Sequence, residues 1–212
     1  MKFFTISSVF KFSWDQVASA FWQRYPNPYS KHVLSEDVVN REISSGLLYS
    51  TRLITKTNPL PRWGERFVPG PRHVCVLEES IVDPCNKTIT TYTRNIGMQR
   101  VMTVEERCVY KVDPENTKWT VCERSTWVSS SIYGFGRAIQ AFGMDRIKKN
   151  SVKASKGYEY ILEKLYVPET IPEQTLHRTD KLKEAARKAA EVAAAKAKSK
   201  TRPILASPSQ MS

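Results

Sequence analysis

The first side chain that could bind an anion is an arginine held where the chain must turn sharply. Arg24 follows a short apolar helical pattern and precedes Pro26 and Pro28. Proline lacks an N–H donor and restricts the residue before it, so the helix must end here, with Arg24 at its rigid end beside aromatic side chains. The planar guanidinium suits a phosphomonoester. The alternative is that Arg24 only extends its charge into solvent.

A second set of cations lies on a long helix that the pattern predicts over residues 136–165. One line along this helix begins with the apolar residues Phe135, Ile139 and Phe142. The same line continues at helical spacings of three and four with Arg146, Lys149, Lys153 and Lys156. This pattern favours either an anion-binding face next to an apolar one or a solvated basic face, which is what most charge runs are.

No catalytic or metal-binding set of residues stands out in the sequence. The three histidines do not cluster with the cysteines, which are Cys75, Cys85, Cys108 and Cys122. Neither a zinc site nor a dithiol redox motif is therefore indicated. Glu105 and Glu106 are neighbours in a predicted strand, so they point to opposite faces and cannot act together on one substrate. We expect no enzymatic activity, no catalytic residues, no cofactor and no metal.

The charge balance points to an acidic partner. Lysine and arginine outnumber aspartate and glutamate by 33 to 21, which gives a net charge of +12. Nucleic acid, an anionic lipid or an acidic protein would suit this charge. The sequence has no RNA-recognition, KH or zinc-finger pattern, and many lysines lie near the C-terminus, so we do not expect nucleic-acid binding. No apolar run approaches the roughly 18 residues of a membrane span, and the N-terminus lacks the apolar core of a secretory signal.

The elements that would position these cations form an α+β pattern. Ser13 and Gln16 make a capping box that begins a short helix. Short connections between the predicted strands favour an antiparallel meander. We expect a curved antiparallel sheet of about seven strands, with the long helix across it and a cavity between the two. The predicted strands cover residues 1–12, 31–43, 47–57, 73–82, 87–96, 100–112 and 119–129.

Two segments fall outside this pattern. Prolines bracket a long loop at residues 58–71, and loops of this length are usually functional or disordered. We expect it to act as a lid over the cavity. After residue 167, prolines are followed by an Ala/Lys-rich repeat with little apolar surface to bury. The prediction is a domain at 1–167 and a tail at 168–212 that is partly helical or disordered.

Several short blocks, in this order, resemble the PRELI family of mitochondrial lipid carriers. They are RYPNPYSKHVL (24–34), TRLITK (51–56), LPRW (60–63), TYTRN (91–95) and VEE (104–106). The similarity runs over about residues 1–167, and the Ala/Lys-rich tail resembles that of the animal PRELI proteins. The blocks together are specific, although a double-proline motif alone is weak.

The resemblance implies a START-like fold that carries phosphatidic acid across the mitochondrial intermembrane space and so supports cardiolipin synthesis. It also implies a small helical partner of the TRIAP type, with paired cysteine motifs, and transient contact with anionic membranes. Alternatives are an anionic-lipid-binding or scaffolding protein without transfer activity, or a carrier of phosphatidylserine.

The resemblance also assigns roles to residues of this chain. The headgroup-binding positions are Arg24, Lys56, Arg146 and Lys153. The lid positions are Arg62, Trp63, Phe67 and Val68. Some relatives carry a further lysine just before the Leu-Pro of the lid, where this chain has Pro59, so the charges around the pocket differ there.

Overall fold

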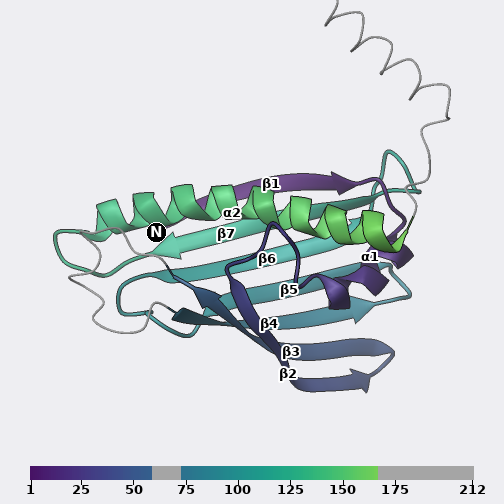
Figure 1. Ribbon diagram of the computed structural model, residues 1–212, viewed down its shortest axis with the longest axis horizontal. Helices are drawn as coiled ribbons and strands as arrows, with labels where there is room; N and C mark the ends of the chain where they lie inside the picture. Colours follow the sequence, from purple (N-terminus) through teal and green to yellow (C-terminus); the bar gives the residue numbers. More distant parts are fainter. Residues whose placement is uncertain (59–72, 167–212) are drawn as a thin grey trace, which may run out of the picture. The chain divides into compact units, whose positions relative to one another are not determined.

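The computed structural model describes residues 1–58 and 73–166 of the chain. In this part seven antiparallel strands form one sheet in the order β1-β7-β6-β5-β4-β3-β2. Helix α2, Gly136–Leu165, lies along β1 and β7 on one face of the sheet (Figure 1). This is the helix-grip arrangement of START-like proteins, so the predicted fold class is confirmed. The strands are β1 (Lys2–Phe10), β2 (Val33–Ser44), β3 (Leu47–Thr57), β4 (His73–Asp83), β5 (Thr88–Asn95), β6 (Thr103–Val112) and β7 (Thr120–Ser129).

The first strand lies at the edge of the sheet farthest from the second. Strands β2 to β7 form the predicted meander, but β1 pairs with β7. Helix α1 (Trp14–Ala20) and a 3-10 turn, η1 (Phe21–Gln23), carry the chain from one edge to the other. The predicted capping box begins α1: Ser13 Oγ accepts the Gln16 N–H at 3.4 Å, and Gln16 Oε1 accepts the Ser13 N–H at 3.0 Å.

One end of the sheet is closed by an apolar core. Helix α1 packs there against the C-terminal half of α2, where Tyr158 donates a hydrogen bond to the carbonyl of Val17. Burying this many aromatic side chains is the main source of stability in a domain of this size. The core includes Phe10, Phe12, Trp14, Val17, Phe21, Tyr110, Tyr158, Ile161 and Leu162.

The opposite end of the sheet, which we call the loop end, carries the segments around the site. The strand register places Thr103 opposite Ser129, and Thr57 opposite His73. The loop end is made by the β5–β6 connection (96–102), the β7–α2 connection (130–135) and residues 31–32 before β2. None of the helices in residues 1–58 and 73–166 is long and apolar enough to cross a bilayer.

Candidate functional site

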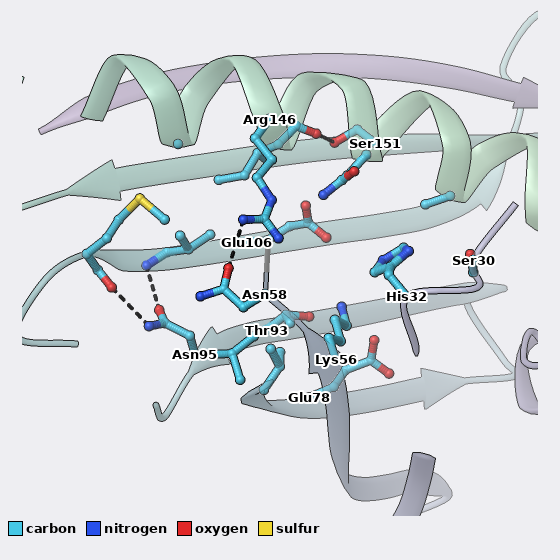
Figure 2. A pocket seen from close by; sticks show the side chains of 18 of the residues that line it. Ser30, His32, Lys56, Asn58, Glu78, Thr93, Asn95, Glu106, Arg146 and Ser151 are labelled. Carbon is cyan, nitrogen blue, oxygen red and sulfur yellow. Dashed lines mark hydrogen bonds between the residues drawn. The ribbon is translucent and has the colours of Figure 1, made fainter. Parts of the chain in front are cut away.

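A cavity of about 250 Å³ lies between α2 and the sheet (Figure 2). Because side chains alternate along a strand, every second residue of β4, β5 and β6 points into it. The helix contributes residues at the spacings that place them on one face. These are Ile139, Phe142, Gly143, Arg146, Ile147, Asn150, Ser151 and Ala154.

One wall of the cavity is apolar. It is formed where the N-terminal half of α2 meets the β5–β6 connection, and Gly143 is buried at this contact. A Cβ atom at Gly143 would collide with the sulfur of Met102, so the glycine allows the helix and the loop to approach closely. The side chains of this wall are Met98, Val101, Met102, Val104, Ile139 and Phe142.

Arg24 lines the cavity, but a carboxylate of the protein already meets its charge. Its Nη2 donates to both oxygens of Glu78, at 2.8 and 3.1 Å, and its Nε donates to the carbonyl of Phe21 at 3.1 Å. The guanidinium carbon lies 4.0 Å from the centre of the Phe21 ring. Glu78 also accepts a hydrogen bond from Arg52, which bonds Glu36 in turn. The result is an alternating chain of two arginines and two glutamates.

This charge network is almost wholly shielded from water. The side chains of Arg24, Glu78 and Arg52 are 11%, 7% and 2% exposed. Burial alone would raise the pKa of Glu78, but the charges and hydrogen bonds of Arg24 and Arg52 lower it to about 2. Burial would likewise lower the pKa of Arg24, and the charge of Glu78, with smaller contributions from three tyrosines, raises it well above its usual value. This internal partner was not among the predicted site residues, and a headgroup role for Arg24 stays a prediction.

A second ion pair lies on the adjacent strands. Arg124 of β7 donates to Oε1 of Glu106 at 2.6 Å, and Thr126 donates to Oε2 at 3.4 Å. Glu106 faces the cavity, whereas Glu105 is exposed on the other face of the sheet, as the strand alternation predicted. Both carboxylates among the described lining residues are therefore engaged by arginines of the protein.

A group of basic residues gathers nearer the loop end. Figure 2 shows Arg146 extending from α2 toward Asn58, whose Oδ1 accepts a hydrogen bond from Nη1 at 2.8 Å, with Lys56 and His32 nearby. Burial lowers the pKa of His32, and the positive charges of Lys56, Arg146 and Lys153 lower it further. Lys153 is exposed and is not among the lining residues, although its charge acts on His32.

The structure thus groups the predicted site residues unequally. Lys56 and Arg146 lie together beside His32, which the sequence analysis did not single out as a site residue. Arg24 lines the same cavity but is paired with Glu78. The alternation of side chains along β4 could have identified Glu78, because Glu78 points to the same side of the strand as the buried Val76.

The predicted lid and tail cannot be placed beside this site. Arg62, Trp63, Phe67 and Val68 belong to residues 59–72, which lie outside the described part of the chain. The tail at 168–212 also lies outside it, so the predicted domain boundary and the lid both remain predictions.

Comparison with known sequences identifies the family. Residues 15–168 match the PRELI-like family. The chain is 55% identical over 194 residues to human "PRELI domain-containing protein 1, mitochondrial", a match covering 90% of this chain and 87% of that protein. The Bos taurus protein of the same name is 54% identical over 190 residues, or 87% of each chain. "Protein UPS1, mitochondrial" of Saccharomyces cerevisiae is 34% identical over 158 residues, covering 74% of this chain and 90% of that protein.

Comparison with solved structures supports the fold alone. TTHA0849 from Thermus thermophilus superposes with a TM-score of 0.54 at 17% identity, covering 77% of this chain and 99% of that one. Since the family match spans most of the chain and relatives above 50% identity match over nearly their whole length, the chain belongs to the PRELI-like family.

Proposed function

We propose that this protein is a phospholipid carrier, not an enzyme, and that its cargo is phosphatidic acid. The observation that carries the proposal is the charge of the cavity. Its described lining residues include four cations, Arg24, Lys56, Arg124 and Arg146, and two carboxylates. Arg24 and Arg124 engage the two carboxylates, and Lys56 and Arg146 add two further cations to the lining, close to an apolar wall. A headgroup phosphate with acyl chains matches that combination.

Selection by the headgroup follows from the physics of transport. Exposing acyl chains to water costs about 0.8 kcal/mol per CH₂, or roughly 20 kcal/mol for two long chains, so a carrier must enclose them. An apolar enclosure accepts the chains of most phospholipids, and discrimination falls to the headgroup. Choline or ethanolamine would bring a cation and extra bulk toward Lys56 and Arg146. A bare phosphate brings only negative charge, which a poorly solvated site favours strongly.

The size of the cavity implies that it widens when loaded. Its volume of about 250 Å³ lies below the roughly 300–1,000 Å³ of pockets that hold drug-sized ligands. Two long chains need more room than this, and we propose that the contact between α2 and the β5–β6 connection opens to provide it. The wall at this contact contains Met98 and Met102, whose unbranched side chains adapt readily to a new surface.

The proposed setting is the mitochondrial intermembrane space, between the outer and inner membranes, where the cargo would supply cardiolipin synthesis. Support comes from membership in a family whose relatives are named as mitochondrial proteins. A small helical partner of the TRIAP type, with paired cysteine motifs, is part of the same proposal. Apolar side chains exposed along edge strand β2 support a protein partner. They are Leu34, Val38, Val39 and Ile43.

The direct test is to identify and move the cargo. Lipid extracted from the purified protein and analysed by mass spectrometry is expected to be enriched in phosphatidic acid. Vesicle-to-vesicle transfer should be faster for phosphatidic acid than for phosphatidylserine or phosphatidylcholine. Equal rates for the three lipids would contradict headgroup selection, and binding without any transfer would favour a scaffolding role.

His32 provides an internal reporter of headgroup binding. In the lipid-free protein, burial and three neighbouring cations hold the pKa of His32 below its ordinary value. A phosphate bound between Lys56 and Arg146 would offset these charges, so the pKa of His32 should rise on loading with phosphatidic acid. An NMR titration of the ring signals, with and without short-chain phosphatidic acid, measures the change. Phosphatidylcholine serves as the control lipid, and an unchanged or lower pKa with phosphatidic acid would place the phosphate elsewhere.

A further inference from the structure

Two connections at the loop end are joined into one unit. The β5–β6 connection (96–102) and the β7–α2 connection (130–135) lie side by side because Thr103 and Ser129, their neighbours in the chain, are paired in the sheet. The Ser130 hydroxyl donates a hydrogen bond to the carbonyl of Val101 at 2.6 Å. Figure 1 shows both connections at the same end of the sheet as the N-terminus of α2.

The outer surface of this unit exposes three large apolar or aromatic side chains. Tyr133 is 100% exposed, and Phe135 and Ile96 are 51% and 47% exposed. The turn that presents Tyr133 is defined by hydrogen bonds, since Phe135 N–H donates to the carbonyl of Ile132 at 3.3 Å and Gly134 adopts a φ of +75°. Aromatic and apolar residues gathered at an exposed end usually mark a contact surface.

The two connections and the first turns of α2 carry only positive charge. Segments 96–104 and 129–144 contain no aspartate or glutamate, and each contains one arginine. Both arginines, Arg100 and Arg137, are exposed. Tyrosine at the headgroup level of a bilayer, with arginines facing anionic lipids, is the usual composition of a membrane-interface anchor.

The inner surface of the same unit lines the cavity. Met98, Val101 and Met102 of the β5–β6 connection belong to the apolar wall, and α2 begins directly after the β7–α2 connection. A membrane in contact with the outer surface would therefore lie next to the wall that has to move when acyl chains enter.

We propose that this surface, formed by Ile96, Arg100, Tyr133, Phe135 and Arg137, docks the protein on an anionic bilayer, with Tyr133 among the headgroups. The occupant is a bilayer because the surface combines exposed apolar tips with positive charge that no acid of these segments neutralises. The role assigned to docking rests on the proposed carrier function, but docking itself is measurable without transfer.

The test is the partition of the full-length protein onto vesicles of phosphatidylcholine alone or with phosphatidylserine, followed by flotation. Ile96→Ser with Tyr133→Ser is expected to lower the partition coefficient at least about tenfold on both vesicles, because two apolar contacts are lost. Arg100→Gln with Arg137→Gln should lower it about tenfold on the anionic vesicles only. Tyr92→Ser, which removes an exposed tyrosine from β5, is the matched control and should change neither value.

The outcomes separate docking from cargo selection. Lys56→Gln with Arg146→Gln should dock normally, since both residues line the cavity and lie outside the proposed surface. Wild-type partition in both surface variants, with their thermal unfolding unchanged, would overturn the docking proposal even if phosphatidic acid is transferred. Docking that depends on Tyr133 and the arginines, in a protein that moves no lipid, would support the surface and contradict the carrier function.

Discussion

Replacing Glu78 with glutamine is expected to lower the free energy of unfolding by about 3–5 kcal/mol. The carboxylate accepts hydrogen bonds from Arg24 and Arg52, and both guanidinium groups are nearly excluded from water. Glutamine keeps the size of the side chain but removes the charge, which leaves Arg24 without an anion and Arg52 with Glu36 alone. An uncompensated buried charge is among the few changes that cost this much in a single substitution.

Thermal unfolding followed by circular dichroism measures the effect. A loss of 3–5 kcal/mol corresponds to a fall in Tm of roughly 6–20 °C for a domain of this size. Glu79→Gln is the matched control, because Glu79 is the next residue but is exposed on the opposite face of β4. Combining Glu78→Gln with Arg24→Met should destabilise the protein by less than the sum of the two, since the second change removes a charge that the first left unpaired. Equal Tm values for Glu78→Gln and Glu79→Gln would show that the network does not stabilise the fold.

The same carboxylate gives the protein a defined acid sensitivity. The pKa of Glu78 falls from an ordinary 4.5 to about 2 on folding, so folding favours its ionised form. Its contribution to stability is therefore complete above pH 4.5 and is lost as the pH falls toward 2. Wild type should lose more stability than Glu78→Gln over this interval, because the variant has no carboxylate to protonate.

Most of the fold could be predicted because local sequence patterns indicate its helices and strands. The period-two alternation and turn residues place the strands to within a few residues, and the helix over 136–165 has the predicted bounds. The position of β1 could not be predicted in this way. Its partner, β7, lies more than 100 residues away in the sequence, and the crossing made by α1 and η1 leaves no local signal.

In the candidate site, too, local patterns predict some residues, whereas their partners come from distant parts of the sequence. Arg24 was identified because two prolines and a helix end constrain it locally, but its partner Glu78 comes from a distant strand. The alternation of side chains along β3 nevertheless indicates that an internal partner is needed. Arg52 points to the same side of β3 as the buried Ile54, and a charged side chain on a core-facing strand position requires a counter-ion. Lys56 was assigned by resemblance alone, although the same alternation places it on the side of β3 that carries Arg52 and Ile54.

Removing the two cations nearest the loop end is expected to abolish selective transfer of phosphatidic acid. Hydrogen bonds to charged groups contribute about 1.5–3 kcal/mol each, so losing two would weaken headgroup binding by about 3–6 kcal/mol. With about 1.4 kcal/mol for each factor of ten, Lys56→Gln with Arg146→Gln should slow phosphatidic acid transfer at least about a hundredfold. Transfer of phosphatidylcholine should change little, because its choline group carries a positive charge that these two cations do not attract.

The control must retain the fold and remove a positive charge from the same helix while leaving the cavity intact. Lys149→Gln meets this requirement, since Lys149 lies on the same helix, is 71% exposed and pairs with Asp145 outside the cavity. Parallel transfer assays with phosphatidic acid, phosphatidylserine and phosphatidylcholine then separate headgroup selection from a general loss of activity. Equal losses for all three lipids would show that the substitutions damage uptake or folding and not selection.

Arg24 is the less informative place to reverse the charge, although it was the first candidate in the sequence. Arg24→Glu would set a second carboxylate against Glu78 inside a nearly buried network, so the variant would lose stability together with any lipid contact. Arg24→Lys keeps the charge beside Glu78 but loses the planar guanidinium and its hydrogen bond from Nε to the Phe21 carbonyl. If Lys56→Gln with Arg146→Gln transfers phosphatidic acid like wild type while Arg24→Lys does not, the phosphate must reach Arg24 in competition with Glu78. In that case Lys56 and Arg146 do not select the cargo.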